Sequence, residues 1–218
     1  KHFHKIVIMN ILNLNEDCLL HIFSFLDLYD LVNLAQTEDT FKMVTERIFQ
    51  RHREFTISFL EIRMNKIRKI LFYIGPHLNS LTLLMHYRKH NPFVIPVLQT
   101  VAKRCKNLKR LTIDYLNIKK QHVRALQHVV SGLEYLEISH CNNFRENIEV
   151  LLSKCTKLIY LVLRGNQKYK GAGLENIKTL KKIDVDEILC EEPFFKKLVS
   201  QNPQWEIKVF NMYTPYFS

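Results

Sequence analysis

Cysteine and histidine side chains are the groups in this sequence that could act as nucleophiles, bases or metal ligands. The chain has five cysteines and ten histidines among its 218 residues. The cysteines are Cys18, Cys105, Cys141, Cys155 and Cys190, and no two of them form a CxxC pair. Their odd number and scattered positions argue against a disulfide framework and against a structural zinc site. We therefore expect reduced thiols, in a protein of the cytoplasm or nucleus.

Two short stretches partly match chemical motifs but lack the residues that would complete them. His86 and His90 lie four apart in HYRKH, without the glutamate of the HExxH metal-binding motif. The stretch KYKGAG at residues 168–173 lacks the Gly-Lys-Ser or Gly-Lys-Thr ending of a phosphate-binding loop. No serine or cysteine stands in a recognisable set with histidine and aspartate. The sequence thus predicts no catalytic residue, no metal and no cofactor, and we expect a protein that is not an enzyme.

The charged residues are distributed unevenly along the chain. The formal net charge is +11, made up of −3 for residues 1–50, +13 for residues 51–130 and +1 for the remainder. A basic block of this kind is typical of proteins that bind nucleic acid, an anionic membrane surface or an acidic partner. It is equally compatible with solvated helix faces. No apolar run approaches the roughly 20 residues of a membrane span, so we expect none.

One pattern, LxxLxL, recurs from about residue 78 onward. Its five copies are Leu78-Leu81-Leu83, Leu108-Leu111-Ile113, Leu133-Leu136-Ile138, Leu158-Leu161-Leu163 and Leu180-Ile183-Val185. Stretches of helical character, such as KKQHVRALQHVV, separate the copies, and EFTISF and WEIKVF have the look of flanking strands. A strand and a helix recurring every 20–29 residues or so indicate a leucine-rich repeat solenoid, in which each unit buries its leucines against its neighbours.

The repeats also predict which side chains line the concave face. The last two apolar positions of each copy point into the core, so the residues beside them point to the other side of the sheet. One predicted column on that side is Ser80, Arg110, Tyr135, Tyr160 and Lys182. Tyrosine and arginine are enriched at binding hot spots, so we assign substrate binding to Arg110, Tyr135, Tyr160 and Lys182. The alternative is that the neighbouring tyrosines only stabilise the strand pair.

The basic residues are expected elsewhere, on helices and loops outside the concave face. They are Arg63, Lys66, Arg68, Lys69, Lys103, Arg104, Lys106, Lys119, Lys120 and Arg124.

Residues 14–52 have the pattern of three short helices that carry more apolar side chains than they can bury. Asn15 and Asp27 can each cap a helix, and a third helix is expected from about Thr40 to His52. Between Cys18 and Leu26 only two residues are polar, as expected for a helix covered on every side. Because a unit of roughly 40 residues buries little surface alone, its apolar side chains require another covering.

The stretch LNEDCLLHIFSFLDLYDLVNLAQT resembles the F-box. The positions that carry the resemblance are Leu14, Asp17, Leu19, Ile22, Leu26, Asp27 and Leu31. Two positions depart from it, since Asn15 stands where proline is usual and Phe41 where tryptophan is frequent. Joined to the repeats, this stretch makes the chain similar to the F-box/leucine-rich-repeat proteins. The expected fold is α/β, with an N-terminal extension at 1–13, a three-helix F-box at 14–52 and a leucine-rich-repeat solenoid at 53–218. In the solenoid we expect parallel strands on the concave face and helices on the convex face.

The resemblance implies a non-catalytic substrate receptor of an SCF-type cullin–RING ubiquitin ligase. In that family the F-box binds the Skp adaptor, and through it cullin, while the repeats bind the protein to be ubiquitinated. We assign adaptor binding to Leu14, Leu19, Ile22, Leu26 and Leu31. The alternative is a basic repeat-domain binder of nucleic acid or anionic phospholipid that has no role in ubiquitination. The substrate itself is not predicted by one sequence.

Overall fold

The computed structural model describes residues 10–60, 64–85, 94–141, 145–166 and 169–210. Arg63, His86 and His90 lie outside the described residues, as does most of the expected N-terminal extension. The chain divides into two compact units, Lys1–His52 and Arg53–Ser218. No helix in the described part of the chain is long and apolar enough to cross a lipid bilayer.

The first unit consists of short helices, and side chains cap the starts of α1 and α2. A 3-10 turn, η1 (Ile11–Asn13), precedes α1 (Glu16–Phe23), α2 (Leu28–Leu34) and α3 (Asp39–Phe49). The side chain of Asn15 accepts a hydrogen bond from the Cys18 backbone N–H at 2.9 Å, and that of Asp27 accepts one from Asp30 at 2.8 Å. Both predicted caps are therefore confirmed, and each satisfies a backbone donor that the helix leaves unpaired.

The second unit is a seven-stranded parallel sheet whose strands lie in chain order. The strands are β1 (Glu54–Ser58), β2 (Ser80–Leu84), β3 (Arg110–Asp114), β4 (Tyr135–Ser139), β5 (Tyr160–Arg164), β6 (Lys182–Asp186) and β7 (Glu206–Phe210). EFTISF and WEIKVF thus form flanking strands, as predicted. All apolar residues of the five LxxLxL copies are at most 4% exposed, so each repeat buries its leucines by stacking on its neighbours.

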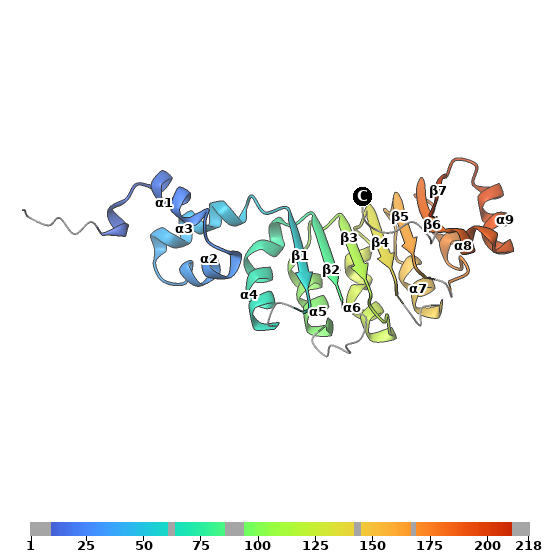
Figure 1. Ribbon diagram of the computed structural model, residues 1–218, viewed down its shortest axis with the longest axis horizontal. Helices are drawn as coiled ribbons and strands as arrows, with labels where there is room; N and C mark the ends of the chain where they lie inside the picture. The colour runs from blue at the N-terminus through green and yellow to red at the C-terminus, as the bar shows by residue number, and fades with distance from the viewer. Residues whose placement is uncertain (1–9, 61–63, 86–93, 142–144, 167–168, 211–218) are drawn as a thin grey trace, which may run out of the picture. The chain divides into compact units, whose positions relative to one another are not determined.

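Helices connect the strands on one side of the sheet (Figure 1). They are α4 (Met64–Ile74), α5 (Val94–Arg104), α6 (Lys120–Val130), α7 (Arg145–Leu152), α8 (Glu187–Glu191) and α9 (Pro193–Gln201), with 3-10 turns η2 (Gly75–His77) and η3 (Leu174–Asn176). The helices α4 to α7 pack one against the next. The described basic residues listed above lie on α4, α5, α6 and the turns beside them, as expected. The α/β solenoid prediction is confirmed.

Backbone hydrogen bonds also join the repeats where each strand begins. The carbonyl oxygen of Glu134 accepts from both Ile159 and Tyr160, at 2.9 and 3.0 Å, and that of Ile159 accepts from Lys181 and Lys182 at the same two distances. In the same way, the carbonyls of Arg53, Asn79 and Lys109 each accept two N–H groups, at the starts of β2, β3 and β4. Backbone groups at the amino-terminal ends of the strands are therefore hydrogen-bonded between repeats, while the side chains there remain available to other molecules.

Candidate functional site

The parallel register brings the predicted substrate-binding residues into one column. Ser80 pairs with Arg110, Arg110 with Tyr135, Tyr135 with Tyr160, and Tyr160 with Lys182. Equivalent residues of adjacent strands stand about 4.8 Å apart, so side chains separated by more than 20 residues in sequence become direct neighbours. The column extends to Glu54 at one end and to Glu206 at the other.

Two cations flank two tyrosine rings in this column. The Arg110 guanidinium carbon lies 4.1 Å from the centre of the Tyr135 ring, and the Lys182 Nζ lies 5.1 Å from that of Tyr160. The rings themselves meet edge to face with centroids 5.0 Å apart. Each contact is a favourable one for an aromatic ring, whose face is negative and whose edge is positive. The four side chains consequently form one continuous surface.

Carboxylates hold both tyrosines in place. The Tyr135 hydroxyl donates to Glu137 at 2.7 Å and the Tyr160 hydroxyl donates to Asp184 at 2.6 Å. Burial and these carboxylates raise the pKa of both phenols, that of Tyr160 to about 12. Asp184 is itself 1% exposed and lies 3.9 Å from the Arg164 guanidinium. The rings are thus oriented before any partner arrives, which lowers the entropy lost on binding.

The two cations of the column differ in what they can offer to a partner. Lys182 is already paired with Glu206 at 2.6 Å. Arg110 is exposed and has no acidic partner among the described residues. Its guanidinium covers the Tyr135 ring, which leaves its in-plane N–H donors free for an acceptor on another molecule. Arg110 is therefore the available charge on this surface.

A second cluster, not found from the sequence, lies where β3, β4 and β5 end. Tyr115 and His140 have φ values of 57° and 52°, and Gly165 at the equivalent place has φ 65°. The Tyr115 and His140 rings stack with centroids 4.6 Å apart. His140 Nδ1 lies 2.8 Å from the Asp114 carboxylate, and Gly165 N–H donates to Asp186 at 2.6 Å. Three successive repeats therefore leave the sheet through the same left-handed turn.

Steric crowding explains why a glycine occupies position 165. A Cβ at Gly165 would lie 2.3 Å from Cδ2 of His140, closer than van der Waals contact allows. The only sequence signal of the cluster was Gly165 itself, because left-handed conformations favour glycine. Burial raises the pKa of the Asp186 carboxyl, which accepts the hydrogen bond from the Gly165 N–H.

The repeat cysteines pack in the core. Cys105, Cys141 and Cys155 are 4%, 2% and 3% exposed, and burial raises the pKa of each thiol to about 12. Such thiols are poor nucleophiles, since the thiolate is the reactive form. In the described ranges no group of three histidine, cysteine or carboxylate side chains could hold a metal ion.

The residues assigned to adaptor binding lie in two environments. Leu19 and Leu31 are 0% and 2% exposed, so they form part of the core of their own unit. Ile22 and Leu26 are 41% and 38% exposed, and Leu14 is half-buried. Phe25 was not singled out from the sequence, yet at 77% it is the most exposed large apolar side chain among the described residues.

A family model and a solved structure are similar to this chain to different extents. The F-box domain family matches residues 11–37. No curated protein matches the chain. Among solved structures, a chain of the crystal structure of the Rad7 and Elc1 complex in yeast is similar, with 16% identity and a TM-score of 0.49. The match covers 89% of this chain and 61% of that chain, so this chain spans about three fifths of the yeast chain's length.

The domain match and the fold together describe the two units of the chain. Residues 11–37 match the F-box domain family, and every strand of the second unit is parallel to its neighbours in the order of the chain. The protein thus carries an F-box domain near its amino-terminal end, followed in sequence by a domain of leucine-rich-repeat type.

Proposed function

We propose that this protein is a substrate-recognition subunit of an SCF-type cullin–RING ubiquitin ligase. Its F-box binds a Skp-type adaptor, its repeats bind the protein to be ubiquitinated, and catalysis resides in other subunits. The observation that carries the proposal is the F-box domain at residues 11–37, joined to a repeat domain with a preorganised concave surface.

The proposed adaptor surface is the exposed apolar side of the first unit. Ile22, Phe25 and Leu26 are spaced i, i+3 and i+4, so they lie on one side of α1 and of the turn that follows it. Exposed apolar side chains that gather in this way mark interaction sites. Leu14, which is half-buried, is also assigned to adaptor binding. Leu19 and Leu31 support it from within the core.

The proposed substrate surface is the column of Arg110, Tyr135, Tyr160 and Lys182. Hot spots are enriched in tyrosine and arginine held in well-packed surroundings. Here the hydrogen bonds from the tyrosine hydroxyls to Glu137 and Asp184 keep both rings in place. The guanidinium of Arg110 packs on the Tyr135 ring and keeps N–H donors that a partner can use. The competing interpretation, in which the tyrosines only stabilise the sheet, predicts that changes at Arg110 leave substrate binding intact.

Copurification with a Skp-type adaptor tests the first half of the proposal. The variant Ile22→Asp/Phe25→Asp should lose the adaptor, because two charges replace apolar contact area and each hot spot contributes about 2 kcal/mol or more. The matched control is Val150→Asp, which also places a charge at an exposed apolar site, 52% exposed on α7. The proposal fails if the double variant retains the adaptor as well as the control does.

Protein turnover in cells tests the second half. Arg110→Glu should stabilise the proteins that the unaltered receptor destabilises, while adaptor binding remains. The control is Arg124→Glu, which reverses an exposed charge on α6. An identical turnover profile for Arg110→Glu and unaltered protein would assign the column a structural role only.

The second candidate function is binding of nucleic acid or anionic phospholipid through the basic residues of α4, α5 and α6. Its support is the concentration of charge in residues 51–130, which carry +13. Such binding weakens steeply with salt, by roughly 10³–10⁵ between 50 and 200 mM for six to ten phosphate contacts. Tight binding with that salt dependence, together with no adaptor in the copurification, would favour this candidate.

A further inference from the structure

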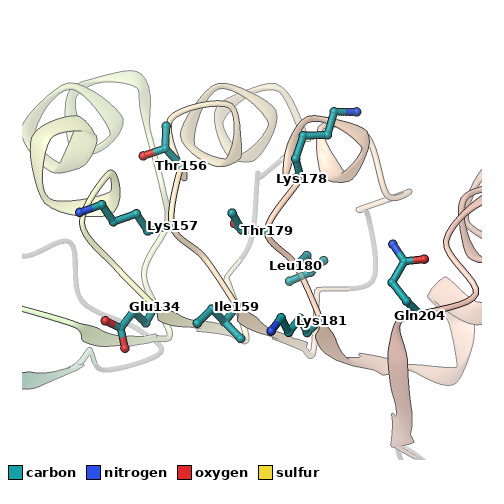
Figure 2. A pocket seen from close by; sticks show the side chains of 9 residues that line it. All are labelled: Glu134, Thr156, Lys157, Ile159, Lys178, Thr179, Leu180, Lys181 and Gln204. Atoms are coloured by element: carbon teal, nitrogen blue, oxygen red, sulfur yellow. The ribbon is translucent and has the colours of Figure 1, made fainter.

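A groove lies at the amino-terminal ends of the strands, beside the starts of β4 to β7. Its volume is about 490 Å³, and it is bounded by the turns that lead into these strands. Figure 2 shows Glu134, Ile159 and Lys181 in a row along one side, with Lys157 and Lys178 across from them. The volume is within the range of about 300–1,000 Å³ usual for ligand-binding pockets. None of these residues belongs to the surfaces described above.

Positive charge dominates the groove. Lys157 and Lys181 are exposed, and neither has an acidic partner in the part of the chain that the structure describes. Lys178 donates to a backbone carbonyl, that of Glu175, at 2.9 Å and so keeps its charge uncompensated. Glu134 is the acidic residue of the lining, and Lys109 already neutralises it at 2.9 Å. Three lysines without an acidic partner among the described residues therefore line the rim of this space.

The space between the lysines is apolar. Ile159 is 40% exposed and lies in the middle of the row, between Glu134 and Lys181. The Thr179 hydroxyl donates to the carbonyl of Leu158 at 2.6 Å and that of Thr156 to the carbonyl of Ser131 at 3.0 Å. With their polar groups engaged in this way, the threonines can present methyl groups to the groove.

The backbone beside the groove is already paired. The carbonyls of Glu134 and Ile159 each accept two N–H groups from the next repeat. Because these backbone carbonyls at the strand starts are already hydrogen-bonded, recognition in the groove relies on side chains. The lining contains neither arginine nor an aromatic ring, the groups on which single-stranded nucleic acids stack. Lysines around an exposed isoleucine instead complement carboxylates around an apolar side chain.

We propose that this groove binds an acidic peptide segment, with an apolar side chain of the segment on Ile159 and its carboxylates on Lys157, Lys178 and Lys181. The site shares no residue with the proposed adaptor surface, and the proposal does not depend on ubiquitin-ligase activity. It gives the repeat domain a second contact surface besides the column of Arg110, Tyr135, Tyr160 and Lys182. This second surface lies at the amino-terminal ends of the strands.

Fluorescence anisotropy on the full chain tests the proposal. The probe is a fluorescein-labelled peptide of four Glu-Glu-Leu units, compared with Gln-Gln-Leu and all-glutamate peptides of the same length. The Glu-Glu-Leu peptide should bind most tightly, and its affinity should fall several-fold between 50 and 300 mM salt because exposed charges are screened. Equal binding of the glutamine peptide would overturn the proposal.

Charge reversal locates the binding. Lys157→Glu/Lys181→Glu should weaken binding of the Glu-Glu-Leu peptide by about tenfold or more, since two attractions become repulsions. Lys154→Glu/Lys197→Glu is the matched control, because it changes the net charge equally at two exposed lysines outside the groove. Ile159→Ser should weaken binding several-fold while leaving the affinity for the all-glutamate peptide unchanged.

Two further outcomes would overturn the proposal. One is an equal loss of affinity in the groove variant and in the control variant, which would mean that net charge alone attracts the peptide. The other is tighter binding of a labelled twelve-residue oligothymidine than of the peptide, abolished by Lys157→Glu/Lys181→Glu, which would assign the groove to nucleic acid.

Discussion

The F-box unit and the repeat unit use their apolar side chains in opposite ways. In the first unit Ile22, Phe25 and Leu26 are 41%, 77% and 38% exposed. In the second, the apolar residues of all five LxxLxL copies are at most 4% exposed. A small helical unit has too little interior for its apolar residues, whereas stacked repeats cover one another. The comparison teaches that the first unit leaves a group of apolar side chains on its surface, while the repeat unit buries the leucines that define its repeats.

Substitutions on the two sides of α1 give the largest expected effect. Leu19→Asp should destabilise the first unit by about 4 kcal/mol or more, because it removes core packing and buries an unpaired carboxylate. Ile22→Asp should change stability by less than about 0.5 kcal/mol, since that side chain is exposed. Urea unfolding of the full chain, followed by circular dichroism, measures both. Equal destabilisation by the two changes would show that α1 has no free apolar side.

The repeat unit is tested at the left-handed turn after β5. Gly165→Ala should destabilise by about 2–3 kcal/mol, because alanine is strained at this φ and its Cβ would clash with His140. Gly132→Ala is the control, where the nearest atom to an added Cβ lies 3.8 Å away. That change should stabilise by about 0.4–1 kcal/mol, because it restricts the unfolded chain. Thermal unfolding of the two variants would contradict this account if they ranked the other way.

The concave face gives the next smaller effect. Tyr160→Phe removes the donor to Asp184, which is 1% exposed, and should cost about 1–3 kcal/mol. Tyr135→Phe should cost less, about 0.5–1.5 kcal/mol, because Glu137 retains a hydrogen bond from Ser139 at 3.0 Å and is partly exposed. Chemical denaturation of the two variants ranks them. A reversed ranking would mean that Asp184 finds another donor when the hydroxyl is lost.

Alkaline pH gives the smallest expected effect. The pKa of Tyr160 is raised from 10.0 to about 12 in the folded protein. Below pH 10 the phenol is protonated in both states and its contribution to stability is complete. Above pH 10 the unfolded chain loses the proton first, so this contribution falls as pH approaches 12. Urea unfolding at pH 9 and pH 11 should therefore show a smaller loss of stability for Tyr160→Phe than for the unaltered protein. Equal losses would mean that the hydroxyl titrates normally.

Much of the repeat unit could be predicted because its signals are local and repeated. The spacing of Leu111 and Ile113, and of their equivalents, determines which side of each strand enters the core. Equal patterns in successive repeats then align the strands, so the column from Ser80 to Lys182 was predicted correctly. The caps at Asn15 and Asp27 were predictable for the same reason, since a cap involves only the next three residues.

The sequence by itself therefore determined the two kinds of unit, the register of the sheet and the helix starts. Only the tertiary structure decided which residues of α1 are buried, because a helix that is apolar nearly all round has no periodicity to mark its inner side. It also decided the left-handed turns at Tyr115 and His140, which rest on a ring contact between repeats. Likewise it brought Lys157 and Lys181 to one groove. The turns and the groove arise from contacts between residues far apart in the chain, whose geometry exists only once the repeats have stacked.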